Sequence, residues 1–210
     1  MEIQYYGGNC IRLSSKKATV VIDDNLAQLG QKSILKPGDI ALKTTPNIDV
    51  NAPTAKILID SPGEYEVSGV SVHGIPARAH VDEDGKKTAT VFKIMVDDIR
   101  LAVVGHVYPE LNDKQLEALG TVDILIIPTG GNGYTLDSIG ALKLIKKIEP
   151  KLVIPTHYAD KGLKYEVPQQ ELSEVLKGLA MESKETVPKL KLKSSGELGE
   201  ITQLIVLERQ

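Results

Sequence analysis

Short runs of apolar, β-branched residues alternate with polar turns through the first half of the chain. Runs of this length and composition predict β-strands. The strands predicted in this half cover Ala18–Asp23, Ala55–Asp60, Val70–Ile75, Thr88–Val96 and Arg100–His106. The pair Asp97–Asp98 between the last two runs predicts a hairpin turn, and the apolar run Ile40–Leu42 is a further candidate strand. The first half is therefore predicted to be mainly β-sheet.

The second half alternates strand patterns with helical patterns. Leu116 and Leu119, three positions apart between Asn112 and Gly120, predict a helix with a capping residue and a terminal glycine. Further helices are predicted over Thr135–Pro150, with Ile139, Leu142, Ile145 and Ile148 on one face, and over Gln169–Ala180. Strands are predicted over Asp123–Thr129, Lys151–His157 and Ile201–Arg209. Strands covered by helices predict a layered α/β protein, and continuous apolar runs predict strands buried on both faces.

Composition narrows the class of protein. The chain has 210 residues, of which 41% are hydrophobic, and this is enough for one domain over residues 1–210 with a sizeable core. A net charge of −3 argues against a dedicated nucleic-acid-binding protein, and no apolar stretch is long enough to span a membrane. The start lacks a signal-peptide pattern and Cys10 is the only cysteine, so we expect a cytoplasmic protein with Cys10 buried. The oligomeric state stays open.

Three of the four histidines lie at or beyond the ends of predicted strands. His106 and His157 end apolar runs, and His80 follows the run that begins at Val70, whereas His73 lies within that run and is expected on a sheet face. Neutral imidazole is the commonest metal ligand, and three imidazoles with a carboxylate suit Zn²⁺ with an open position. The alternative is that each histidine only forms a hydrogen bond to a neighbouring loop.

Two other patterns have simpler interpretations. The glycine loop Thr129–Asp137 could bind an anion at the next helix, but it lacks the lysine of a phosphate loop. A tight strand-to-helix turn capped by Thr135 or Asp137 is therefore favoured. The alternating lysines of Lys189–Lys193 predict one solvent-exposed face of a strand.

Several segments together resemble the metallo-β-lactamase superfamily, and within it the short hydrolases similar to ascorbate-phosphate lactonase. The segments that carry the resemblance are "YYGGNCIRL", "VVIDD", "SPGEYEVSGVSVHGIPA", "DILIIPTGGNGYTLD" and "KLVIPTHY". The resemblance implies an αββα sandwich, in which two sheets face each other with helices outside.

The resemblance also implies a degenerate metal site in the stretch "GDIALKTTPNIDVNAP". The family has an H-x-H-x-D-H motif here, and its four ligand positions are taken by Thr45, Asn47, Asp49 and Val50. Gly8 stands in place of an opening histidine, and His106 in place of the aspartate that bridges two metals. His157 matches the last histidine ligand of the family, and His80 its middle one.

Two hypotheses follow from this resemblance. In the first, the protein is a hydrolase with at most one metal ion, which the ligand types predict to be zinc, held by Asp49, His80, His106 and His157. Asp49 and His80 would then be catalytic, and Asn47 and Tyr158 would orient a small anionic ester, lactone or phosphorylated metabolite. In the second, metal and catalysis are lost and the fold serves as a binding or regulatory module for a small molecule. An RNA nuclease is disfavoured by the short chain and its negative charge.

Overall fold

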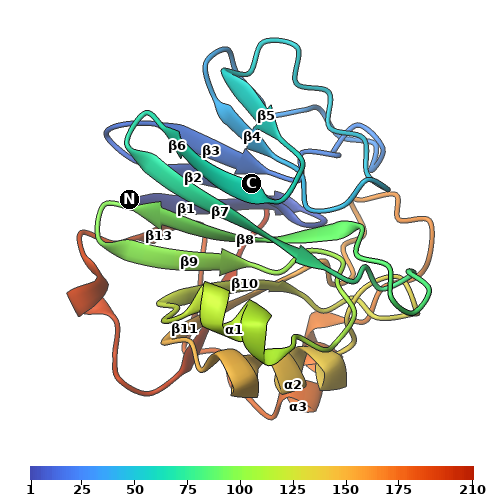
Figure 1. The fold of residues 1–210 in the computed structure, drawn as a ribbon. Coiled ribbons are helices and arrows are strands. Elements are labelled where there is room, and N and C mark those ends of the chain that lie inside the picture. Colours follow the sequence, from blue (N-terminus) through green and yellow to red (C-terminus); the bar gives the residue numbers. More distant parts are fainter.

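Two β-sheets face each other in the computed structural model, which describes residues 1–210 (Figure 1). One sheet has six strands in the order β13-β1-β2-β3-β4-β5. The other has eight strands in the order β12-β14-β11-β10-β9-β8-β7-β6. The predicted sandwich of two facing sheets is thereby confirmed.

The six-stranded sheet is built mainly from the first third of the chain. Its strands are β1 (Glu2–Gly7), β2 (Cys10–Ser14), β3 (Thr19–Ile22), β4 (Ile40–Leu42), β5 (Ile57–Ile59) and β13 (Leu190–Lys191). β3, β4 and β5 are mutually parallel. Parallel strands bring their carboxyl ends to the same edge of the sheet, so Asp23 and Thr44, which follow β3 and β4, emerge side by side.

The eight-stranded sheet combines an antiparallel half with a parallel half. Its strands are β6 (Gly63–Val67), β7 (Val70–Ala77), β8 (Ala89–Val96), β9 (Ile99–Val103), β10 (Ile124–Pro128), β11 (Leu152–Thr156), β12 (Glu185–Val187) and β14 (Gln203–Leu207). Val96 pairs with Ile99 across β8 and β9, which confirms the predicted turn at Asp97–Asp98. β9, β10 and β11 are parallel, so His106 and His157 leave the sheet at the same edge.

Three α-helices lie on the outer face of the eight-stranded sheet (Figure 1). They are α1 (Asp113–Leu119), α2 (Ser138–Ile148) and α3 (Leu172–Leu179), and a short 3-10 helix covers Ser195–Glu197. Asn112 caps α1 and Asp137 caps α2, as the sequence predicts. None of the helices has the length and apolar character that crossing a membrane requires.

The outer face of the six-stranded sheet carries a loop in place of the helix expected there. Leu26 and Leu29 of this loop pack against Cys10 and Val21 of the sheet, and Leu163 completes the cluster. The prediction of helices outside both sheets therefore holds for the eight-stranded sheet alone. Cys10 is buried beneath this loop, as predicted.

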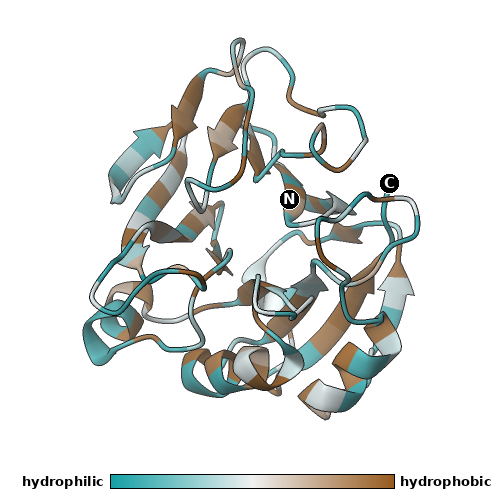
Figure 2. Ribbon diagram, turned by 90° about the vertical axis from the view of Figure 1, so that its right-hand side faces the viewer, coloured by the Kyte–Doolittle hydropathy of each residue, from teal (hydrophilic) through white to brown (hydrophobic).

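The main core lies between the sheets and under the helices. It contains 49 buried residues, almost all aliphatic, and Figure 2 shows them as hydrophobic bands along the strands. In α2 the buried side chains include Leu144, Ile145 and Ile148. Ile139, predicted on the same face, is 64% exposed. Ile145 and Ile148 are buried as predicted, but the prediction for Ile139 was wrong, because the first turns of the helix pack through Gly140, Ala141 and Leu144.

Candidate functional site

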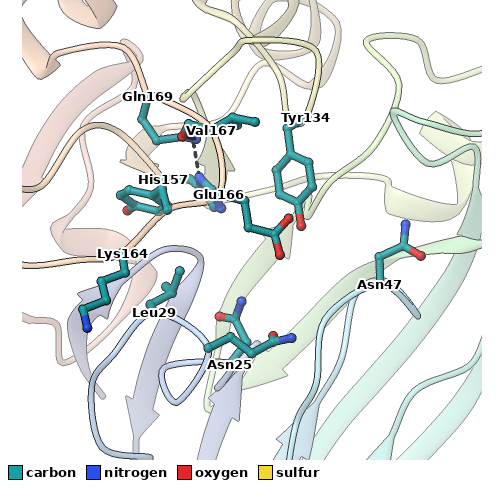
Figure 3. Close-up of a pocket in the computed structure, with 11 residues that line it drawn as sticks. Asn25, Leu29, Asn47, Tyr134, His157, Lys164, Glu166, Val167 and Gln169 are labelled. Carbon is teal, nitrogen blue, oxygen red and sulfur yellow. Dashed lines mark hydrogen bonds between the residues drawn. The ribbon is translucent and has the colours of Figure 1, made fainter.

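A polar cleft opens at the edge where the strands of both sheets end (Figure 3). Sites in layered α/β proteins form at such edges because loops from several strands converge there. The cleft has a volume of about 220 Å³. It is lined by Asn25, Gln28, Leu29, Asn47, Tyr134, His157, Lys164, Tyr165, Glu166, Val167 and Gln169. Figure 3 shows the Tyr134 hydroxyl and the Glu166 carboxylate directed toward its middle.

Two buried histidines contact each other beside the cleft, and of these His157 lines it. Nε2 of His106 is 3.2 Å from Nε2 of His157. Nδ1 of His157 is 3.1 Å from Oε1 of Gln169, the contact drawn as a dashed line in Figure 3. Burial is the main cause that lowers the pKa of both imidazoles from its usual value. Both rings are therefore neutral at pH 7.

Backbone geometry holds His157 in this position. Its φ angle is +59°, in the left-handed region, and its N–H donates to the Gly8 carbonyl at 2.8 Å. Gly130 allows Gln169 to approach: a Cβ atom there would lie 1.8 Å from Gln169 Oε1 and 2.2 Å from the His157 carbonyl oxygen. Real Cβ atoms do not come this close to other heavy atoms, so only glycine permits the contact between Gln169 and His157.

A buried hydrogen-bond network joins the two sheets just behind the histidines. The Asp23 carboxylate accepts from Asn9 Nδ2 at 2.7 Å, from the Thr44 backbone N–H at 2.7 Å and from the Thr44 hydroxyl at 2.6 Å. The Thr156 hydroxyl, next to His157 in sequence, donates to Asn9 Oδ1 at 2.7 Å. Burial raises the pKa of Asp23 to about 6 even though these hydrogen bonds lower it. The network positions the end of β11, and with it His157.

A second, much smaller chamber adjoins the cleft beside His80. The His80 backbone N–H donates to the His106 carbonyl at 2.8 Å, so the two loops run together. The chamber has a volume of about 10 Å³ and is lined by Thr45, Asn47, Ala79, His80, Val81, His106 and Tyr134. Asn47 and Tyr134 line both spaces, so the chamber and the cleft are neighbours.

The structure brings together some of the residues that the sequence predicts for the site. His106 and His157 are in contact, His80 adjoins His106, and Asn47 lines the cleft. Asp49 is exposed, its backbone N–H donates to Gln28 Oε1 at 3.0 Å, and its carboxylate has no hydrogen bond or ion pair. Whether these residues serve as ligands or catalysts stays a prediction.

Tyr158 lies on the core side of the site. Its hydroxyl donates to the Leu207 carbonyl at 3.2 Å, and its ring lies 5.8 Å from that of Tyr5, centroid to centroid. Tyr158 is absent from the lining of the cleft and of the chamber. This position does not favour the predicted role in orienting a substrate.

Several lining residues could not be found from the sequence. Lys164, Glu166 and Gln169 come from the connection between β11 and α3, which carries no motif. Tyr134 belongs to the glycine loop, which the sequence favours as a simple turn. One signal in the sequence could have indicated Tyr134. It is an aromatic residue that directly follows a segment with three glycines in four positions, just after a buried strand.

Two facing sheets with a polar cleft at their strand ends are the architecture of the metallo-β-lactamase fold. Residues 2–157 match the family model described as the beta-lactamase superfamily domain. Because this match covers more than half of the chain, the protein belongs to that family. The narrower resemblance to ascorbate-phosphate lactonase stays a prediction.

Several known proteins are similar to the chain. A UPF0173 metal-dependent hydrolase of Thermoplasma acidophilum is 27% identical over 190 residues, which cover 75% of this chain and 83% of that protein. A UPF0173 metal-dependent hydrolase of Pyrococcus horikoshii is 30% identical over 101 residues, which cover 46% of this chain and 44% of that protein. The chain thus spans less than half the length of this second relative.

Solved structures share the fold over the whole chain. A proposed Zn-dependent hydrolase of the metallo-β-lactamase superfamily from Thermotoga maritima matches with a TM-score of 0.75 at 24% identity, covering 99% of both chains. A proposed metal-dependent hydrolase from Parabacteroides distasonis matches with a TM-score of 0.69 at 16% identity, covering 99% of this chain and 93% of that one. At these identities the likeness establishes the fold alone.

The relatives named as metal-dependent hydrolases suggest a metal cofactor, but the residues at this site do not fit one. No group of three or more His, Cys, Asp or Glu side chains is placed to hold an ion. A catalytic Zn²⁺ site needs three protein ligands and an open position. Val50 is a buried apolar residue, and a Cβ on Gly8 would lie 2.8 Å from Leu29 Cδ1, so a histidine cannot be added there without moving Leu29.

Proposed function

We propose that the cleft binds a small polar metabolite with an acidic group and that it does so without a resident metal ion. One observation carries the proposal: no third His, Cys, Asp or Glu side chain joins His106 and His157 in a group that could hold an ion. The chain would then be a ligand-binding member of a hydrolase family. This matches the second of the two hypotheses that the sequence allows.

The lining of the cleft holds one cation, Lys164, and one carboxylate, Glu166, and so supports a small ligand with an acidic group for Lys164 and a hydrogen-bond donor for Glu166. A volume of about 220 Å³ is below the roughly 300–1,000 Å³ of pockets for drug-sized molecules. Lys164 lies at the cleft and forms no salt bridge within the chain, so its charge is free to pair with an anion. Asn25, Gln28 and Asn47 add amide groups that can donate hydrogen bonds.

Binding of acetate and of inorganic phosphate, measured by NMR titration in the presence of a chelator, tests the proposal. Either probe should shift resonances of the cleft in a saturable way without metal. Lys164→Gln should weaken binding several-fold because it removes the one cation at the cleft. The matched control is Lys161→Gln, three residues away and exposed, which does not line the cleft. Absence of binding by both probes would contradict the proposal.

A mononuclear hydrolase is the second candidate, and the spacing of the histidine pair favours it. Two nitrogens bound to one tetrahedral Zn²⁺ at ~2.0–2.1 Å are ~3.3 Å apart, and Nε2 of His106 lies 3.2 Å from Nε2 of His157. Asp49 or His80 would have to move to complete the ligand set. One tightly bound zinc per chain, lost on His106→Ala, together with hydrolysis of a small lactone or phosphate ester, would establish this candidate.

A further inference from the structure

The direction of each hydrogen bond at the histidine pair follows from Gln169. The Gln169 amide nitrogen donates to the Val167 carbonyl at 2.8 Å, so its oxygen faces His157. An amide oxygen only accepts, and His157 Nδ1 must therefore carry a hydrogen. In the neutral ring this leaves His157 Nε2 as an acceptor. The hydrogen between the two rings then belongs to Nε2 of His106.

This chain of hydrogen bonds leaves one nitrogen with a free lone pair. Because neutral His106 carries its hydrogen on Nε2, its Nδ1 is an acceptor. Nδ1 of His106 is buried and has no hydrogen-bond partner. Nδ1 of His80 is also buried without a partner. A buried acceptor without a donor costs about 1–3 kcal/mol. Both side chains line the small chamber, so a donor placed there would satisfy Nδ1 of His106.

We propose that the small chamber is a subsite for one hydrogen-bond-donor group of the ligand, a hydroxyl or an ammonium group, accepted by His106 Nδ1. The inference deepens the proposed function and rests on it. The ligand would hold its acidic end in the cleft near Lys164 and its donor group in the chamber, past Tyr134 and Asn47. Small hydroxy acids and amino acids have this chemistry.

The size of the chamber limits the group that enters. Its volume of about 10 Å³ is close to the roughly 10–15 Å³ that a single water molecule needs. A hydroxyl or ammonium group is of this size, whereas a methyl ether is larger and has no hydrogen to donate. The subsite therefore selects by size and by donor capacity together. In the free protein, one water molecule is the expected occupant.

The tautomer of His106 is the first test, measured by long-range proton–nitrogen NMR on the full chain at pH 7. The expected result is hydrogen on Nε2 of His106 and on Nδ1 of His157. Hydrogen on Nδ1 of His106 would overturn the inference, because that nitrogen would then donate and could not receive the group. This measurement needs no ligand and does not depend on the proposed function.

A matched series of four probes is the second test: glycolate, glycine, methoxyacetate and acetate. All four carry a carboxylate, and they differ in a hydroxyl, an ammonium, a methoxy group and a hydrogen. Glycolate or glycine should bind at least tenfold more tightly than acetate and methoxyacetate and should shift the His106 resonances. Tighter binding of glycolate would identify a hydroxyl as the donor group, and tighter binding of glycine an ammonium group. Equal affinity for all four overturns the subsite but leaves the proposed function standing, and no binding by any of them overturns the proposed function as well.

Two variants separate the chamber from the cleft. Thr45→Leu fills the chamber, of which buried Thr45 is a lining residue, and should abolish the preference for a donor while acetate still binds. Lys164→Gln should weaken all four probes and keep the preference, because Lys164 lines the cleft and not the chamber. The same preference in Thr45→Leu as in the parent chain would overturn the inference. An unchanged NMR spectrum away from the site shows that each variant is folded.

Discussion

Replacing Asp23 with asparagine should change how the stability of the protein depends on pH. The Asp23 carboxylate is fully buried and accepts three hydrogen bonds, one from Asn9 and two from Thr44. Burial raises its pKa, the hydrogen bonds lower it, and burial is the larger cause. The result is a pKa of about 6 in the folded protein against an ordinary 3.8.

The raised pKa fixes the sign of the effect. The folded state holds the Asp23 proton more tightly than the unfolded state does, so this contribution to stability is fully present below pH 3.8. It is lost as the pH rises through about 6. At 1.36 kcal/mol per pKa unit, the difference amounts to about 3 kcal/mol. Asp23→Asn has no proton to exchange and lacks this loss. The new amide group of Asp23→Asn can place its NH₂ against the NH₂ of Asn9, which costs roughly 1–3 kcal/mol of stability. This cost is the same at every pH and leaves the pH dependence unchanged.

Urea denaturation followed by circular dichroism, at pH values from 4 to 8, measures the effect. The free energy of unfolding of the parent chain, relative to that of Asp23→Asn, should fall by about 2–3 kcal/mol between pH 4 and pH 7. Stability curves of the two proteins that run parallel over this range would refute the reasoning. They would mean that Asp23 stays ionised through the hydrogen bonds and that burial is the smaller cause.

Three further substitutions test other parts of the structure. Gly130→Ala should destabilise the fold by about 1–3 kcal/mol and shift the imidazole resonances of the cleft, because its Cβ would lie 1.8 Å from an oxygen atom; a variant as stable as the parent would refute this close approach. Arg100→Ala should cost about 1–3 kcal/mol in urea denaturation, because the buried carboxylate of Asp123 loses the guanidinium but keeps Lys151 and the backbone N–H of residue 100; stability equal to that of the parent chain would contradict it. Ile139→Ser should change stability by less than about 0.5 kcal/mol, and Leu144→Ala should cost about 2–5 kcal/mol; the reverse order would restore the helix face read from the sequence.

Most of the fold could be predicted from the sequence because strand length, β-branched composition and capping residues are local signals. The predicted helix Asn112–Gly120 corresponds to α1, with Asn112 and Gly120 as its caps. The strand predicted at Lys151–His157 corresponds to β11 (Leu152–Thr156). The third helix was predicted to begin at Gln169, but α3 begins at Leu172 because the preceding residues contact the cleft.

The site was predictable only where a residue type is rare. Histidines at strand ends stand out, and the structure places His106 against His157. Amides, lysines and tyrosines are common on any surface, so nothing in the sequence marked Gln169 or Lys164 as lining residues. The loop between β4 and β5 resembles a ligand motif, yet Asp49 belongs to no group of three candidate ligands, because such a group depends on the conformation of the loop and not on spacing alone.

Metal content is the measurement that tests the central claim most directly. The protein should be purified without chelators from metal-replete medium and analysed by inductively coupled plasma mass spectrometry, beside His106→Ala. We predict far less than one equivalent of zinc, iron or manganese per chain, and the same trace in the variant, because the site offers two imidazoles and no third ligand. One or more equivalents in the parent chain that disappear in His106→Ala would contradict the account and establish a metal site.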